Sequence, residues 1–283
     1  MNFEQSEEEK KDYLKLANEK GINLPEFLIL IEKTIKQIEI ITPALENLKS
    51  KISDIQPDRI IFLSKGADLF FNPFKKYFEE NGIHQEIDRY NDDDLKGLYL
   101  NQALDIEFVK KSFPKLSDQK IIFVDETFSA GKGALAIYEM AHIVNAKNIY
   151  YFALSQDSNK KSIEENLEMA DSKIDPSKFK NDLSTIEDNP NFILNNCFID
   201  ENLFSSDIGK KIKYDFRDDA GNTITLKRDL SNYGVDKEKN SKIPNAFSYS
   251  NKDELEREKE RLRQSFLTEE LMEEIIYDAI ARE

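Results

Sequence analysis

The sequence predicts an α/β fold built around a parallel sheet, and three short apolar runs carry this prediction. Residues 59–63, 120–124 and 148–154 are rich in Ile, Phe, Val and Tyr, and each run has the length of a buried strand. Apolar residues at helical spacing follow the first two runs, at 69–78 and 134–144. Because strands that alternate with helices pair in parallel through right-handed crossovers, this order of segments indicates a buried parallel sheet.

Residues 1–55 are predicted to form a helical N-terminal extension. Apolar residues recur every three or four positions from Leu24 to Ile41 and would line one helical face. Pro25 suits the first turn of this helix, whereas Thr42 followed by Pro43 is typical of a cap with proline at the first position of a new helix. The sequence therefore predicts that the first long helix ends near Thr42.

The α/β core is assigned to residues 56–158, and a divergent α+β region follows it. Residues 159–250 are interpreted as an insertion or a hood-like region, because their composition changes to polar, Asn- and Lys-rich sequence. Within it, residues 211–216 and 223–227 alternate in polarity around a turn at 218–222, which predicts a β-hairpin.

Residues 251–283 are predicted to form a C-terminal amphipathic helix. Its apolar stripe runs from Leu267 to Ile280 and is too large to leave in water. We expect the stripe to pack on the rest of the chain or to form the seam of a homodimer.

Composition and charge narrow the classes of function. Forty basic and 55 acidic residues give a formal net charge of -15, which repels polyanions and argues against binding to long nucleic acids. No apolar run approaches the roughly 20 residues that cross a bilayer, the N-terminus lacks a signal-peptide pattern, and Cys197 has no second cysteine to pair with. We therefore expect a cytoplasmic protein without membrane contact, in which a phosphorylated ligand needs backbone amides, a lysine or a metal ion.

The segment after the second apolar run carries the strongest functional pattern. Residues 125–133 are Asp-Glu-Thr-Phe-Ser-Ala-Gly-Lys-Gly and are predicted to be a loop that enters a helix. The preceding strand would hold the carboxylates of Asp125 and Glu126 at its C-terminal end, where open α/β sheets bind ligands. The turn would direct backbone N–H groups at a phosphate, and Ser129 and Lys132 would add a hydroxyl donor and a positive charge.

Residues 121–133 resemble the phosphoribosyl-diphosphate-binding motif of the type I phosphoribosyltransferases, especially that of the orotate enzymes. The resemblance implies that Asp125 and Glu126 hold the two ribose hydroxyls and act as catalytic and metal-binding residues. It further implies that the 5-phosphate is bound by residues of the turn: Thr127, Ser129, Ala130, Gly131, Lys132 and Gly133.

A second match follows the first apolar run. Leu63-Ser64-Lys65-Gly66-Ala67 resembles the diphosphate loop of the same family, in which Lys or Arg precedes Gly. The resemblance implies a catalytic role for Lys65 and substrate contacts from Ser64, Gly66 and Ala67. An ordinary strand-to-helix turn is an alternative for this segment, just as an acidic turn that caps the next helix is an alternative for Asp125 and Glu126.

The resemblance implies a magnesium-dependent transferase that moves a phosphoribosyl group from phosphoribosyl diphosphate to a nitrogen nucleophile such as a nucleobase. Mg²⁺, Lys65 and loop amides would hold the diphosphate leaving group while Asp125 and Glu126 fix the ribose. Two alternatives stay open. One is a non-catalytic sensor of phosphoribosyl diphosphate or a nucleoside monophosphate, which the acidic segment 88–99 favours, and the other is an effector that attacks nucleotides in a conflict or defence setting.

Overall fold

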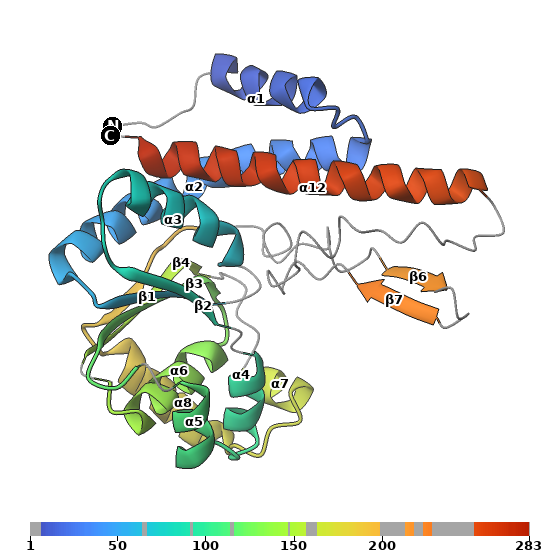
Figure 1. The fold of residues 1–283 in the computed structure, drawn as a ribbon. Helices are drawn as coiled ribbons and strands as arrows, with labels where there is room; N and C mark the ends of the chain where they lie inside the picture. The colour runs from blue at the N-terminus through green and yellow to red at the C-terminus, as the bar shows by residue number, and fades with distance from the viewer. Residues whose placement is uncertain are drawn as a thin grey trace. The chain divides into compact units, whose positions relative to one another are not determined.

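The computed structural model describes residues 7–63, 67–90, 93–113, 116–146, 148–156, 163–198, 213–217, 223–227 and 252–282 (Figure 1). The chain forms two compact units, one of Met1–Glu39 with Asp200–Glu283 and one of Ile40–Ile199. The long helix α2 (Pro25–Ile55) contributes residues to both.

The unit Ile40–Ile199 contains a five-stranded sheet in which every pair of neighbouring strands is parallel. The strand order is β2-β1-β3-β4-β5. The strands are β1 (Arg59–Leu63), β2 (Glu86–Tyr90), β3 (Lys120–Phe128), β4 (Asn148–Gln156) and β5 (Phe192–Leu194). The predicted α/β class with a parallel sheet is therefore confirmed, and the sheet continues beyond residue 158 through β5.

The strand order reverses between β1 and β3. The chain moves from β1 outwards to β2, returns to the other side of β1 for β3, and then continues outwards through β4 and β5. In open α/β sheets, such a reversal leaves a crevice beyond the carboxyl ends of the two central strands, and ligands bind there. The ends of β1 and β3 are therefore the first place to look for a site.

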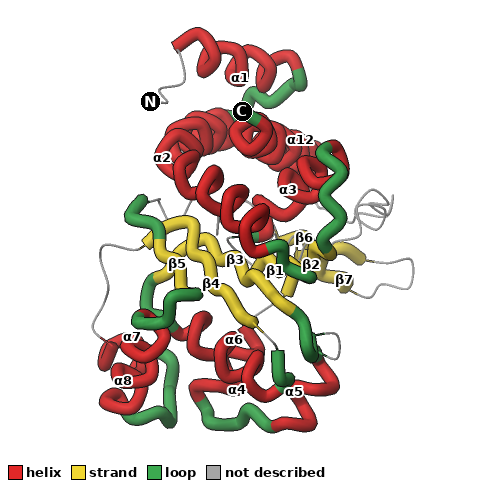
Figure 2. Tube along the Cα trace, turned by 90° about the vertical axis from the view of Figure 1, so that its left-hand side faces the viewer, coloured by secondary structure: helices red, strands yellow, loops and turns green. Residues whose placement is uncertain are grey.

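Helices cover both faces of this sheet (Figure 2). One face is covered by α3 (Asp68–Glu80) and by residues 40–55 of α2, where the Lys49 ammonium lies 5.0 Å from the centre of the Tyr77 ring on α3. The other face is covered by α4 (Asp93–Leu100), α5 (Ile106–Ser112), α6 (Lys132–Ile143), α7 (Ile163–Met169) and α8 (Pro176–Glu187).

The central strands are buried on both faces, which explains their continuous apolar sequence. Alternate residues such as Ile61, Phe123 and Tyr151 join one core with the helices α4 to α8. The residues between them face α3, where the rings of Phe62 and Phe74 lie 5.5 Å apart. All five residues of β1 are buried, so no solvent-facing side exists to give an alternating pattern.

The helices of the second unit are α1 (Glu7–Glu19), the first part of α2 and the C-terminal helix α12 (Lys252–Ala281). The apolar stripe predicted for this last helix is buried within the chain at Leu271, Met272, Ile275, Ile276, Ala279 and Ile280. The Tyr13 hydroxyl on α1 donates to Asp278 Oδ2 at 2.6 Å, and burial together with this hydrogen bond raises the pKa of Tyr13.

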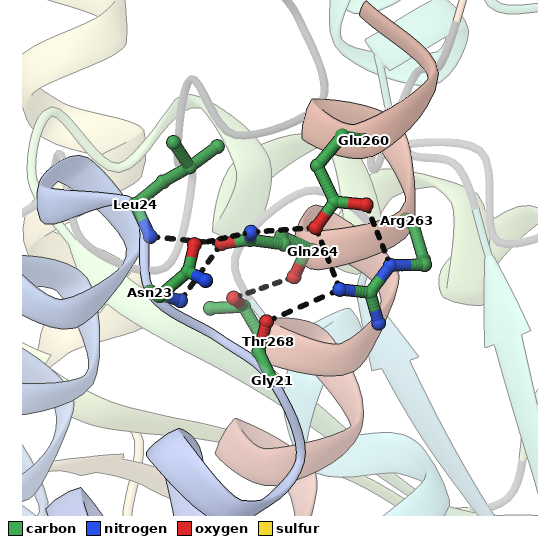
Figure 3. A network of polar contacts seen from close by, with 7 residues as sticks. All are labelled: Gly21, Asn23, Leu24, Glu260, Arg263, Gln264 and Thr268. Carbon is green, nitrogen blue, oxygen red and sulfur yellow. Dashed lines mark hydrogen bonds and ion pairs between the residues drawn. The ribbon is translucent and has the colours of Figure 1, made fainter. Parts of the chain in front are cut away.

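A polar network joins α12 to the residues just before α2 (Figure 3). The Gln264 side chain is fully buried, and its Oε1 accepts the N–H groups of Asn23 and Leu24 at 2.9 and 2.8 Å. Its Nε2 donates to Asn23 Oδ1 at 2.7 Å and to Glu260 Oε1 at 2.8 Å. The first N–H groups of a helix have no partner within that helix, so Gln264 supplies acceptors that the start of α2 needs.

The prediction that the long helix ends near Thr42 is wrong, because α2 continues to Ile55 with Pro43 inside it. The neighbouring side chains Thr42, Ala44 and Leu45 are buried, whereas Pro43 is exposed. A proline leaves one backbone carbonyl of the preceding turn without its donor, and at an exposed position water can replace that donor. Packing of the flanking residues therefore outweighs the local signal for a helix end.

The predicted hairpin is confirmed. The strands β6 (Lys213–Arg217) and β7 (Thr223–Lys227) pair in antiparallel register and form a separate two-stranded sheet.

Within the described parts of the chain, no helix has both the length and the apolar character of a membrane span.

Candidate functional site

The candidate site lies at the carboxyl ends of β1 and β3, where the strand order reverses. The diphosphate loop predicted after β1 falls on Ser64, Lys65 and Gly66, which are outside the described residues. Ala67, the last residue of that prediction, is fully buried and is the N-cap residue of α3. Among the described residues, the site is formed by the end of β3, the turn 129–131 and the start of α6.

The strand β3 is four residues longer than predicted, so the prediction that the loop begins at Asp125 is wrong. Thr127 pairs with Ser155 and Phe128 with Gln156, so β4 continues the ladder to the end of β3. The hydroxyl oxygens of Thr127 and Ser155 lie 2.9 Å apart, and the Phe128 side chain is buried in the core. These partners hold as a strand a segment that has the local sequence of a loop.

The two predicted ribose ligands are the sixth and seventh residues of β3. Asp125 is partly exposed and contacts Tyr151, which belongs to the core shared with α4 to α8. Glu126 is only 6% exposed. Less of Glu126 than of Asp125 is therefore open to a ligand.

Asp125 is held by hydrogen bonds to both carboxylate oxygens. The Tyr151 hydroxyl donates to Oδ2 at 2.5 Å, and the Glu126 backbone N–H donates to Oδ1 at 2.8 Å. The Tyr151 ring is in turn stacked on Phe192 of β5, with 5.2 Å between the ring centres and 17° between the ring planes. Asp125 is therefore a fixed acceptor at the edge of the site, and Tyr151 sets its orientation.

Within the part of the chain that the structure describes, no group of three or more His, Cys, Asp or Glu side chains is placed to hold a metal. The role of Asp125 and Glu126 in binding Mg²⁺ stays a prediction.

The turn before α6 depends on Gly131. This residue has φ +76°, a left-handed conformation that favours glycine, and it is the N-cap of α6. A Cβ atom there would lie 2.4 Å from Leu183 Cδ1 of α8 and 3.2 Å from Phe128 Cζ. Gly131 makes no side-chain cap to α6, and the N-terminus of a helix favours a bound anion. A substitution at Gly131 disturbs packing as well as the turn, so it cannot by itself test ligand binding.

Two lysines come together at the start of α6. Lys132 is the first residue of the helix, and Lys96 lies on the neighbouring helix α4. Burial lowers the pKa of Lys132, and the positive charge of Lys96 lowers it further. Because this pKa lies below its ordinary value of 10.5, the charged form of Lys132 opposes folding at neutral pH. This destabilisation by the charged form of Lys132 disappears only when the pH rises above the ordinary pKa of 10.5.

Of the other predicted phosphate-binding residues, Ser129 and Ala130 are partly exposed in the turn, whereas Gly133 is buried in the first turn of α6. The structure adds Tyr151 and Leu183, which no sequence pattern indicated. Both contact the site from elements that follow it in the chain, so only the folded structure shows their role.

Cys197, the single cysteine of the chain, is partly buried. Its thiol donates to the Leu154 carbonyl at 2.6 Å, and burial raises its pKa, which keeps it protonated. It lies in the irregular segment after β5 rather than in a strand.

Comparisons of the chain with protein-family models, with curated proteins and with solved structures gave no match. The site is therefore interpreted from its own geometry and from the motif resemblance at residues 121–133.

Proposed function

We propose that the unit Ile40–Ile199 binds a phosphorylated ribose compound, phosphoribosyl diphosphate or a nucleoside monophosphate, with its phosphate at the turn 129–131 and the start of α6. The reversal of the strand order between β1 and β3 supplies the location, and the N-terminus of α6 supplies backbone donors for an anion. The resemblance at residues 121–133 supplies the class of ligand.

The observation that carries the proposal is the approach of Lys132 and Lys96. The chain has a formal net charge of -15, and yet two positive charges are close enough here for one to lower the pKa of the other. Positive charges at the start of a helix, beside the reversal of the strand order, favour a bound anion.

The burial of Glu126 favours binding without turnover over phosphoribosyl transfer. A transferase of the predicted kind uses both carboxylates on one ribose, whereas here Glu126 is only 6% exposed. Asp125 keeps unused acceptor capacity beside its bonds to Tyr151 and Glu126 and can accept one ribose hydroxyl. The form of the function that this geometry favours is therefore a sensor of the phosphorylated ribose compound.

Isothermal titration calorimetry with ribose 5-phosphate, adenosine monophosphate and phosphoribosyl diphosphate, each with and without Mg²⁺, tests the proposal. We expect saturable binding of at least one of them, and Lys132→Gln should weaken it by about tenfold or more, as for loss of a hydrogen bond to a charged group. Lys132→Gln should not lower the melting temperature, because it removes a charge that opposes folding.

The matched control is Lys75→Gln, which removes the same charge from an exposed position on α3. It should leave the affinity nearly unchanged. Equal losses in the two variants would mean that only net charge matters, and no binding of any of the three compounds would refute the proposal.

Phosphoribosyl transfer stays the second candidate because of the motif resemblance. Its assay is the release of pyrophosphate from phosphoribosyl diphosphate in the presence of a panel of nucleobases. Turnover that Asp125→Asn and Glu126→Gln each abolish would establish the transferase and reject the sensor. Tight binding with no pyrophosphate release would establish the sensor.

A further inference from the structure

A cavity lies among the helices α4, α6 and α8, which cover one face of the sheet. It is a groove of about 620 Å³ between the end of α4, the C-terminal half of α6 and α8. This volume is within the range of small-molecule sites, roughly 300–1,000 Å³. The groove's lining residues on α6 run from Leu135, three residues after Lys132, to His142, about 10 Å further along the helix axis at ~1.5 Å per residue. The groove shares no residue with the proposed phosphate site.

Two tyrosine hydroxyls are buried at this groove. Tyr99 and Tyr138 both line it, and neither hydroxyl oxygen has a hydrogen-bond partner among the described residues. The Tyr99 side chain is only 8% exposed, so bulk water does not solvate its hydroxyl. A buried hydroxyl without a partner costs stability, and native structures usually satisfy such groups with protein, water or a ligand. Two of them at one groove indicate a molecule that is bound there.

The charges at the groove select a cation. Glu139 lies on α6 and makes no ion pair within the described parts of the chain, whereas Asp182 on α8 pairs with Lys178 at 3.0 Å. Burial, together with the negative charges of Asp182 and Glu139, raises the pKa of Tyr99 to about 12. The groove also lies along the C-terminal half of α6, the end of a helix where the backbone dipole favours positive charge.

We propose that this groove binds a small organic amine in its protonated form. The carboxylate of Glu139 accepts a hydrogen bond from the ammonium group, and the hydroxyl oxygens of Tyr99 and Tyr138 accept after their side chains turn towards the groove. The apolar part of the molecule packs on Leu135 and Ile186, which also line the groove. The amine site rests on none of the residues of the proposed phosphate site, so either one can fail without the other.

Three probes that share one ring and differ only in charge test the selectivity: benzylamine, benzyl alcohol and benzoate. Each is titrated into the full chain and followed by two-dimensional amide NMR. Benzylamine should give saturable shifts around Tyr99, Tyr138 and Glu139, with a Kd on the order of 1 mM, as expected for so small a ligand. Benzyl alcohol should bind more weakly, and benzoate should bind at least about tenfold more weakly than benzylamine.

Two variants separate the charge from the hydroxyl. Glu139→Gln should weaken benzylamine by about tenfold and leave benzyl alcohol unchanged, because only the ammonium group uses the carboxylate charge. Tyr99→Phe should weaken both probes. The matched control is Glu79→Gln, an exposed carboxylate on α3. It should weaken neither probe.

The unliganded stability of Tyr99→Phe gives a separate readout. A hydroxyl that waits for a ligand makes no bond in the free protein, so the melting temperature of Tyr99→Phe should equal or exceed that of the parent. If bound water satisfies the hydroxyl instead, the melting temperature falls and benzylamine does not saturate, which overturns the proposal. Equal binding of benzylamine and benzoate, or equal losses in Glu139→Gln and Glu79→Gln, would overturn it as well.

Discussion

Gly131→Ala should destabilise the protein far more than other glycine-to-alanine substitutions in the same unit. The φ of +76° at Gly131 is the left-handed conformation, which costs about 1–2 kcal/mol for a residue with a Cβ. The new Cβ would also lie 2.4 Å from Leu183 Cδ1, a distance at which one of the two groups must move.

The second cost comes from packing. Leu183 is buried in the core formed with α6, so its side chain has little room to withdraw. Overpacking of a filled core costs about 1–3 kcal/mol. The two terms together predict a loss of about 2–5 kcal/mol for Gly131→Ala.

Two other glycines provide controls for the two terms. Gly82 has φ +63° and no atom within 4 Å of the point where a Cβ would lie, so Gly82→Ala should cost only the conformational term of about 1–2 kcal/mol. Gly97 lies inside α4 without a positive φ and with open space around it, and Gly97→Ala should stabilise by about 0.4–1 kcal/mol. Urea denaturation followed by circular dichroism measures all three.

The rank order of the stability changes in the three variants tests whether packing adds to the conformational cost at Gly131. A loss at Gly131 no larger than the loss at Gly82 would show that Leu183 does not fill the space beside the turn. Combining Gly131→Ala with Leu183→Ala adds a further check, because contacting residues should show a coupling energy of about 0.5–3 kcal/mol. Strict additivity would contradict the contact.

Three further predictions concern hydrogen bonds. Tyr151→Phe should lower the free energy of unfolding by about 1.5–3 kcal/mol in thermal melts, because Asp125 loses its donor at 2.5 Å, and an unchanged melt would contradict that bond. Gln264→Ala should cost about 1–3 kcal/mol in urea denaturation, because two part-buried N–H groups lose their acceptor. The hydrogen bond from Arg263, with a second from Gln264, lowers the pKa of Glu260 to about 2 from 4.5, so its contribution to stability is complete above pH 4.5 and is lost as the pH falls towards 2. Glu260→Gln should therefore reduce the loss of stability between pH 4.5 and 2, and parallel pH profiles for variant and parent would exclude this role.

The sequence predicted those strands whose stability comes from burial on both faces. The runs 59–63 and 120–124 are continuously apolar because each central strand meets helices on two sides. No pattern indicated β2, whose sequence Glu-Ile-Asp-Arg-Tyr is polar because it lies at the edge of the sheet. The three residues of β5 are too few to stand out from the loop around them.

The candidate site shows where local sequence stops being informative. Asp and Glu are uncommon in strands, so Asp125 and Glu126 predict a loop, and the fold overrides them. The partners that keep them in the strand are Tyr151 and Ser155, both on β4 and more than twenty residues later in the chain. The turn and the helix start at Lys132 were predicted, because glycine and the apolar helical pattern are local signals.

The pairing of Asn23 with Gln264 also bears on how the chain folds during synthesis. The two residues are 241 positions apart, and at ribosomal rates of about 5–20 residues per second this separation takes roughly 12–48 s to translate. Until α12 emerges, the start of α2 lacks its acceptor, and α1 lacks the Asp278 carboxylate that binds Tyr13. The sheet-containing unit has all of its strands by residue 194 and can form first, so the helical unit is the last part of the protein to be completed on the ribosome.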